Sequence, residues 1–154
     1  MASLRLTNCY GPRLRIRDAR QTFLANWMRE VLRGNAFEVW GGEQLRDLTF
    51  VDDVTEAFLL AAAEPRCHGR IFNVGGAPPV ALAALAKMLV EVAGNGARYV
   101  VKNFPEDRAK IDIGSYYADD SAFRDATGWT PVTDVRTGLE KTLAWLRPRL
   151  DEYC

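Results

Sequence analysis

Short runs of β-branched and aromatic residues alternate with longer segments of helical period along this chain, and no other feature limits the fold as much. Apolar residues recur at helical spacing, which predicts helices at about 20–33, 52–64, 82–93, 121–128 and 133–146. The intervening apolar runs are typical of strands, which are expected at about 4–8, 37–40, 48–51, 70–74 and 99–102. Strands interleaved with helices indicate an α/β or α+β domain.

Acidic and hydroxyl side chains mark where several of these helices should begin. Asp52 or Asp53 is expected to cap the second helix, with Glu56 completing a capping box. Thr133 or Asp134 is expected to cap the last helix in the same way. These caps place helix starts directly after an apolar strand or a loop.

Length and charge exclude several classes of protein. The chain has 154 residues, of which 48% are hydrophobic, so we expect one domain over residues 1–154. Twenty basic residues balance twenty acidic ones, which favours neither nucleic acid nor an anionic membrane as partner. No apolar run approaches the length of a membrane span, and the N-terminal residues do not resemble a signal peptide. A cytoplasmic location is the simplest expectation.

The cysteines give no evidence of a disulfide framework or a metal site. Cys9, Cys67 and Cys154 are odd in number and widely spaced, without a CxxC pair. Only His68 lies close to one of them, which is too few ligands for zinc. Free thiols fit a reducing compartment.

Five motifs follow one another in the chain, and together they carry a resemblance to a known family. They lie within Leu4–Pro12 (Asn-Cys-Tyr-Gly-Pro), Glu38–Asp53 (Val-Trp-Gly, then Gln44, Arg46 and Asp47), Ile71–Gly76 (Ile-Phe-Asn-Val-Gly), Arg108–Asp120 and Gly128–Leu146. In this order they resemble the C-terminal, substrate-binding half of the extended short-chain dehydrogenase/reductase family, specifically its nucleotide-sugar epimerases and dehydratases. The resemblance implies part of a Rossmann-type sheet joined to the small α/β substrate-binding subdomain, without the N-terminal dinucleotide-binding part.

Three polar residues correspond to positions that hold the substrate's diphosphate in this family. By resemblance Arg46 and Arg108 bind the diphosphate, where forked guanidinium groups could engage it in a bidentate way. Asn8, at the end of the first strand, is implied to contact the same group. The alternatives are a salt bridge from Arg46 to Asp47 or Asp52, a solvated loop charge at Arg108, and an Asn that only caps a strand end.

Val39 and Trp40 correspond to the family strand that lines the nucleotide base. Trp40 stands where the family more often has Tyr, which keeps a flat aromatic face but changes the hydrogen-bonding tip. Core packing of both side chains is the competing interpretation.

The chemistry of the family needs residues that this chain lacks. A Gly-rich strand–turn–helix binds NAD in the intact family, and a Tyr and a Lys four positions apart move the proton. No tyrosine here is followed by such a Lys, and Gly94-Asn95-Gly96 follows a helical segment instead of a strand. We therefore expect no catalytic residue, no cofactor-binding site and no metal site in this chain, and no activity when it is alone.

The leading hypothesis is a portion that binds a UDP- or TDP-sugar, and two alternatives stay open. One is a non-catalytic binding or interaction module, and the other is one half of a split enzyme completed by a missing N-terminal half. Loss of that half would leave a sheet edge and apolar faces uncovered. We therefore expect a homo-oligomer built around Leu4, Leu6, Ile71 and Phe72, or on the helix that carries Phe58.

Overall fold

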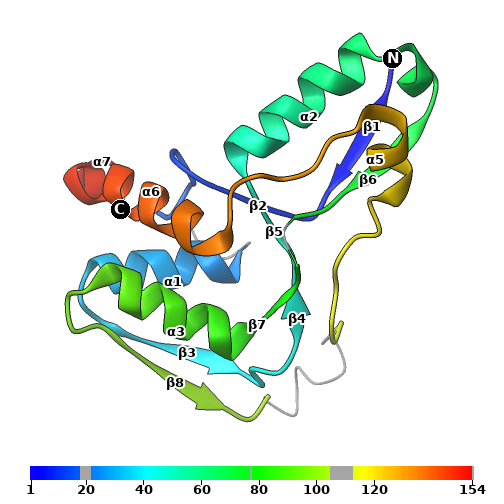
Figure 1. Ribbon diagram of the computed structural model, residues 1–154. Coiled ribbons are helices and arrows are strands. Elements are labelled where there is room, and N and C mark those ends of the chain that lie inside the picture. The colour runs from blue at the N-terminus through cyan, green and yellow to red at the C-terminus, as the bar shows by residue number, and fades with distance from the viewer. Residues whose placement is uncertain (18–21, 77, 105–112, 154) are drawn as a thin grey trace.

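A computed structural model describes residues 1–17, 22–76, 78–104 and 113–153 of the protein (Figure 1). Its strands are β1 (Ser3–Leu6), β2 (Asn8–Tyr10), β3 (Ala36–Trp40), β4 (Leu45–Arg46), β5 (Leu48–Phe50), β6 (Ile71–Val74), β7 (Val80–Ala81) and β8 (Arg98–Lys102). Its α-helices are α1 (Phe23–Leu32), α2 (Val51–Ala63), α3 (Leu82–Ala93), α5 (Ser121–Thr127), α6 (Val135–Leu146) and α7 (Leu150–Tyr153). Single 3₁₀ turns form at Pro65–Cys67 and Arg147–Arg149. Over these ranges, every helix is too short or too polar to cross a bilayer.

The strands pair two by two within the described residues, and three of the pairs are parallel. β1 pairs with β6, β2 with β5 and β3 with β8 in parallel, while β4 and β7 are antiparallel. The strand predicted from Leu4 to Asn8 is therefore two strands, because its two ends have different partners: Leu4 lies opposite Phe72, and Asn8 opposite Leu48. The mixed α/β class agrees with the sequence prediction.

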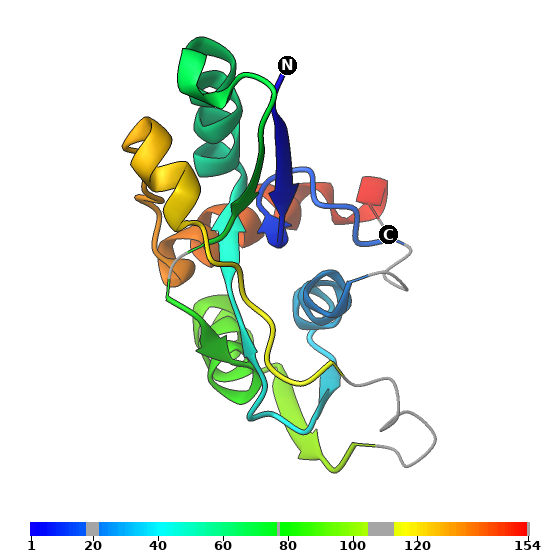
Figure 2. The ribbon, with the colours of Figure 1, turned by 90° about the vertical axis from the view of Figure 1, so that its right-hand side faces the viewer.

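A large apolar cluster fills the space between α1, α3 and α6 and the inner faces of β3 and β5 (Figures 1 and 2). We call it the large cluster. Its fully buried members include Met28 and Val31 from α1, Leu85 and Leu89 from α3, and Leu139 from α6. These residues recur at helical spacing, so the faces predicted from the sequence are the faces that pack.

A second apolar cluster, the small cluster, lies at the other end of the molecule, on one face of the β1–β6 pair. Its buried members come from α2, β6, α5 and the adjoining turns: Ala57, Ala61, Cys67, Phe72, Val74, Phe123, Ala126 and Trp129. The ring of Phe123 lies between those of Phe72 and Trp129, at centroid distances of 5.5 and 5.6 Å. The two clusters give the molecule two lobes, joined where β5 runs into α2 (Figure 2).

One predicted helix cap is confirmed and one is wrong. Asp134 caps α6, since its carboxylate accepts a hydrogen bond from the Thr137 N–H at 2.9 Å. Neither Asp52 nor Asp53 caps α2, because that helix already begins at Val51 and both carboxylates fall in its first turn. There the negative charges still complement the helix dipole.

Candidate functional site

The carboxylate of Asp47 joins segments that are distant in sequence, at the junction of the two lobes. Asp47 is 3% exposed. Its Oδ2 accepts hydrogen bonds from the N–H groups of Ala118, at 3.0 Å, and Gly76, at 3.4 Å. Its main-chain oxygen accepts a bond from Asn8 Nδ2 at 3.0 Å. Because a buried carboxylate needs such donors, Asp47 fixes the position of β2, the turn after β6 and the segment before α5.

The two glycines after β6 allow this close approach. A Cβ atom at Gly75 would lie 2.8 Å from Asp47 Oδ2, and one at Gly76 would lie 2.0 Å from the carbonyl oxygen of Leu48. No side chain fits at either distance, so the Asn-Val-Gly-Gly sequence is explained by the packing of this turn against Asp47 and β5.

Arg46 lies on β4, and its half-buried guanidinium is fixed by main-chain oxygens. Nη1 donates to the carbonyl oxygens of Leu45, at 2.8 Å, and Gly114, at 2.5 Å. Residue 46 also forms an isolated bridge with Tyr116. Within the described ranges no ion pair joins Arg46 to Asp47 or Asp52, and Nε and Nη2 of Arg46 have no partner. The guanidinium is thus oriented through one of its nitrogens, Nη1.

Asn8 and Arg46 both adjoin Asp47, Asn8 through a hydrogen bond to its main-chain oxygen and Arg46 as the preceding residue. One N–H of the Asn8 side-chain amide donates to the Asp47 main-chain oxygen. The second N–H and the amide oxygen have no partner among the described residues, so both could bond a ligand. Asn8 also lines a cavity of about 270 Å³, with Thr7, Leu14 and Phe23 among its other walls. Of the five predicted binding residues, the structure therefore joins Asn8 to the main chain of Asp47, the residue that follows Arg46.

The other predicted residues lie elsewhere. Val39 is completely buried in the large cluster. Trp40 ends β3; its indole N–H donates to Glu38 Oε2 at 3.1 Å, and its ring packs edge-on to Phe104 at 6.0 Å. Arg108 lies outside the described residues. The base-binding role of Val39 and Trp40 stays a prediction, as does the diphosphate role of Arg108.

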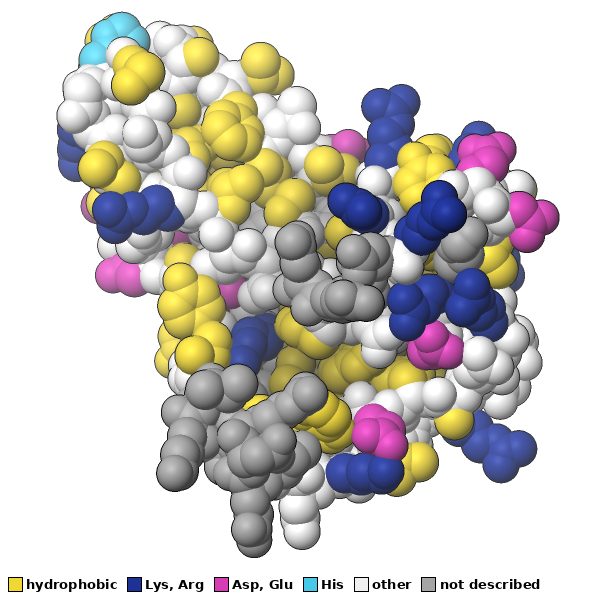
Figure 3. All heavy atoms as spheres, turned by 180° about the vertical axis from the view of Figure 1, so that it is seen from behind, with side chains coloured by type: hydrophobic (Ala, Val, Ile, Leu, Met, Phe, Trp, Pro, Cys, Tyr) yellow, Lys and Arg dark blue, Asp and Glu magenta, His cyan; other side chains and the backbone are white. Residues whose placement is uncertain are grey.

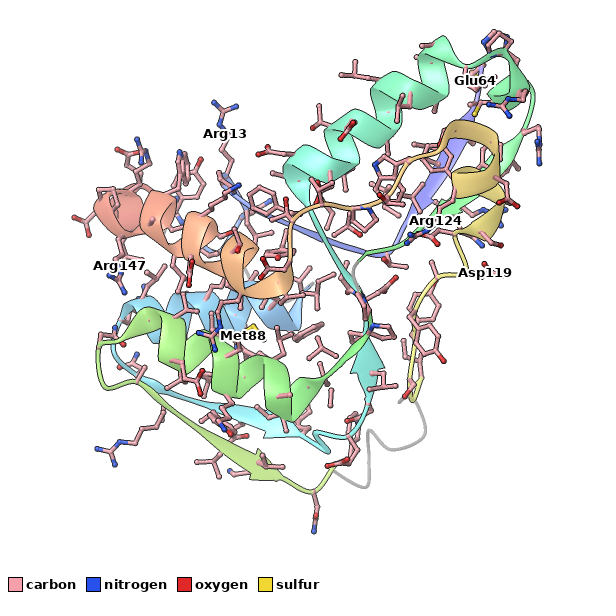
Figure 4. The ribbon with its side chains drawn as sticks, in the orientation of Figure 1. Arg13, Glu64, Met88, Asp119, Arg124 and Arg147 are labelled. Atoms are coloured by element: carbon pink, nitrogen blue, oxygen red, sulfur yellow. The ribbon has the colours of Figure 1, made fainter. Side chains whose placement is uncertain are left out.

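Sequence reasoning did not anticipate a cavity of about 460 Å³ on a further side of Asp47. The ion pair of Asp120 and Arg124, with Nε and Oδ1 2.7 Å apart, forms part of its wall, and Arg124 lies beside the segment that precedes α5 (Figure 4). Further walls are Pro78, Pro79, Tyr117, Pro131, Val132 and Asp134. Most of its walls come from loops, which have no hydrophobic period, so no pattern in the sequence marks it.

Two titratable groups close to Asn8 in sequence have raised pKa values. Burial raises the pKa of the Tyr10 phenol well above its ordinary value, with smaller contributions from Asp134 and Asp53, and its hydroxyl donates to the Val135 carbonyl oxygen at 3.2 Å. Burial also raises the pKa of the Cys9 thiol. No cluster of side chains that could hold a metal ion occurs in the part of the chain that the structure describes.

Residues 1–75 match the model of the NAD dependent epimerase/dehydratase family. This part of the chain belongs to that family. The matched range contains Asn8, Arg46 and Asp47. The chain is 30% identical to UDP-glucuronic acid decarboxylase 4 of Arabidopsis thaliana over 148 residues, which are 95% of this chain and 31% of the relative. The chain thus spans about a third of the length of such curated relatives.

Solved structures show the same fold. UDP-glucose 4-epimerase of Thermotoga maritima, solved with UDP-glucose, is 30% identical with a TM-score of 0.79; the match covers 96% of this chain and 46% of that chain. MoeE5, solved in complex with UDP-glucuronic acid and NAD, is 29% identical with a TM-score of 0.79, over 96% of this chain and 47% of its own. Both share the Rossmann-type fold of the extended short-chain dehydrogenase/reductase family with this chain.

Proposed function

We propose that this chain is the nucleotide-sugar-binding, C-terminal portion of an NAD-dependent epimerase/dehydratase, that its 154 residues act as one domain, and that it is inactive alone. The observation that carries the proposal is the guanidinium of Arg46, which the main-chain oxygens of Leu45 and Gly114 hold through Nη1, next in sequence to the buried Asp47 that Asn8 contacts. A UDP- or TDP-sugar carries the diphosphate that such a fork recognises. The relatives solved with UDP-glucose and UDP-glucuronic acid support this ligand class.

The chain's own residues would bind and orient a substrate without a chemical step. Arg46 would hold the diphosphate, Arg108 would add a second cation, and Asn8 would bond a phosphate oxygen, while Trp40 and the strand of Val39 would line the base. Two cations on the diphosphate leave the sugar free to turn. In this family NAD supplies oxidation and return of a hydride.

The residues present do not fit NAD. Gly94 and Gly96 lie between α3 and β8, in a helix-to-strand turn, so no helix N-terminus follows them to hold a pyrophosphate. Tyr10 has its hydroxyl bonded to a main-chain oxygen and no Lys four positions later. For this reason the proposal includes no proton or hydride transfer by this chain.

Calorimetric titration with UDP-glucuronic acid, UDP-glucose and TDP-glucose, each with and without NAD, tests the proposal. We expect saturable binding that NAD does not change. Arg46→Ala should weaken it about ten- to hundred-fold, because a charge-assisted hydrogen bond contributes about 1.5–3 kcal/mol. Arg46→Lys keeps the charge but not the forked guanidinium, so its affinity should lie between those of the wild type and Arg46→Ala. Arg98→Ala, on the exposed side of β8, is the matched control and should bind normally.

Equal affinity of the wild type and Arg46→Ala would reject the proposal, and so would saturable NAD binding by the chain alone. Absence of any nucleotide-sugar binding would favour the non-catalytic interaction module instead. Turnover only after a separate dinucleotide-binding polypeptide is added would favour the split enzyme.

A further inference from the structure

We propose that Gly114 and Ser115 are positioning residues for Arg46. Together they aim the Gly114 carbonyl oxygen at the guanidinium, so that this group is already oriented when a diphosphate arrives. Both residues act through Arg46 and not by touching the ligand. The identity of the ligand rests on the proposed function, whereas the order of the guanidinium in the ligand-free chain does not. The two claims can therefore fail separately.

β4, which carries Arg46, is held along both of its edges. On one edge it pairs with β7. On the other edge lies the segment of residues 114–118, which runs beside β4 in Figures 1 and 2. There the Leu45 carbonyl oxygen accepts from the Tyr116 N–H at 3.0 Å, and Arg46 forms its bridge with Tyr116. These contacts fix the main chain of Arg46 but not its long side chain.

Gly114 turns the chain so that a carbonyl oxygen faces the guanidinium. Its φ is +62°, in the left-handed region, and a Cβ atom at this position would meet no atom within 4 Å. Glycine is therefore favoured here by the backbone conformation and not by lack of space. The Gly114 carbonyl oxygen accepts from Arg46 Nη1 at 2.5 Å, and the same nitrogen donates to the Leu45 carbonyl oxygen at 2.8 Å. Because the guanidinium is planar, two acceptors on one nitrogen fix its plane.

The Ser115 hydroxyl ties this turn to β4. Its Oγ accepts from the Leu45 N–H at 3.1 Å. The residue after Gly114 is thereby joined to the residue before Arg46, so the carbonyl oxygen and the guanidinium keep their relative position. Ser115 is exposed and belongs to neither apolar cluster. Packing therefore does not explain this side chain, whereas the bond to β4 does.

Orientation matters because a long side chain loses rotamer freedom when it binds a ligand. A guanidinium that the protein already holds loses less of this freedom, which strengthens binding. A variant that displaces the Gly114 carbonyl oxygen should therefore keep the positive charge of Arg46 and still bind a diphosphate more weakly.

Nitrogen-15 relaxation of the Arg46 side chain in the ligand-free chain is the first test, with the Nε–H signal assigned by its loss in Arg46→Lys. We expect an order parameter of about 0.8 in the wild type and below about 0.6 in Ser115→Ala and Gly114→Val. Ser115→Thr keeps the hydroxyl, and Gly114→Asn tolerates the left-handed conformation better than a β-branched residue does. Both should therefore stay close to the wild type.

Two matched controls separate positioning from a general loss of stability. Gly69→Val places the same side chain at a glycine with φ +75° and open space around its Cβ position. Gly69 precedes β6 in the lobe of the small cluster, where hydrophobic side chains gather at the upper left of Figure 3. Thr130→Ala removes an exposed hydroxyl in the loop before α6. Neither control should change the order parameter of Arg46.

Calorimetric titration with UDP-glucuronic acid is the second test. Ser115→Ala and Gly114→Val should weaken binding about two- to tenfold, since a neutral hydrogen bond contributes about this factor. Ser115→Thr and Gly114→Asn should bind like the wild type.

An order parameter of Arg46 that is already low in the wild type, or that neither Ser115→Ala nor Gly114→Val lowers, overturns the proposal. Equal losses in Ser115→Thr and Gly114→Asn overturn it as well, and so does lost order with unchanged affinity. A guanidinium that is ordered in the wild type and released by both variants, in a chain that binds no nucleotide sugar, supports the positioning and rejects the proposed ligand.

Discussion

The two apolar clusters are built differently, although one chain passes through both. In the large cluster α1, α3 and α6 close over β3 and β5. In the small cluster α2 and α5 cover one face of the β1–β6 pair, and the other face is bare: Ser3, Arg5, Ile71 and Asn73 are all exposed. The large cluster is thus complete in itself, whereas the small one is one-sided.

This difference shows in the sequences of the strands. Parallel strands covered on both faces read as continuous apolar runs. β6 instead alternates, with Phe72 and Val74 buried and Ile71 and Asn73 exposed. The alternation means that one layer of helices suffices to bury this lobe's apolar face, and that its stability depends on few large side chains. The following predictions test that contrast.

Truncation of Phe123 should have the largest effect on the small cluster. Phe123→Ala removes the ring between Phe72 and Trp129, and we expect a loss of about 3–5 kcal/mol in the free energy of unfolding. Leu89→Ala is the counterpart in the large cluster, with an expected loss of about 2–5 kcal/mol. Urea unfolding measures the loss in the free energy of unfolding for each variant, and amide hydrogen exchange shows in which lobe the loss occurs.

If the lobes differ as described, Phe123→Ala lowers exchange protection in β6 and α2 more than in α3. Leu89→Ala should then lower amide-exchange protection in both lobes, because the one-sided small lobe depends on the large lobe for part of its stability. Equal loss of protection in both lobes for both variants would contradict the contrast and show one cooperative unit.

Asp53 connects the lobes, so its removal should have an intermediate effect. Asp53 is 2% exposed on α2; its carboxylate accepts from the N–H groups of Val132 and Thr133, at 3.4 and 3.1 Å, in the loop before α6. Asp53→Ala leaves these donors without partners, which should cost about 2 kcal/mol. Asp52→Ala, at the exposed neighbouring position, should change the free energy of unfolding, measured by thermal unfolding, by less than about 0.5 kcal/mol. Similar losses for the two variants would show that the link contributes nothing.

The smallest predicted effect is at the α6 cap. Hydrogen bonds from Thr137, through its hydroxyl and its N–H, lower the pKa of Asp134. A lowered pKa adds stability above the carboxyl's ordinary titration range, and this stability is lost as the pH falls through the folded-state pKa. Asp134→Ala should cost about 1 kcal/mol at pH 7. Asp134→Asn should keep most of the capping, but its stability should no longer fall at acid pH because of this carboxyl. If the wild type and Asp134→Asn lose stability equally as the pH falls, the role given to Asp134 is wrong.

The helices of the large cluster were predictable because each carries its own periodic pattern. Leu139, Leu143 and Leu146 are buried as their spacing predicts, and Gly94, just after α3, has the left-handed conformation typical of a helix end. The division of the strand at Leu4–Asn8 was not predictable, since it depends on two partners more than 35 residues away. The wrong cap at Asp52 or Asp53 has a similar cause: Asp53 is used by the loop at 132–133, which no local rule anticipates.

The candidate site divides in the same way. Arg46 and Asn8 could be named from the motifs, but the motifs do not show that a carbonyl oxygen at Gly114 fixes the guanidinium. The buried position of Val39 follows from β3 packing into the large cluster, a tertiary effect that a five-residue strand does not encode. The sequence named Asp47 as part of a motif and as a salt-bridge partner for Arg46, but its role at the junction was not predictable, because its donors at Gly76 and Ala118 are main-chain groups that any sequence supplies.

The hydrogen bonds of Asp47 also bear on the order in which the chain assembles. They join residues separated by 29 and 71 positions in the sequence, so they close long loops whose entropy cost must be met first. We therefore expect these contacts to form late, after α2 and the other helices, whose contacts are local, are in place. An interaction absent from the folding transition state acts on the rate of unfolding instead of the rate of folding. One carboxylate at the junction therefore governs how long the two lobes stay together once they have met.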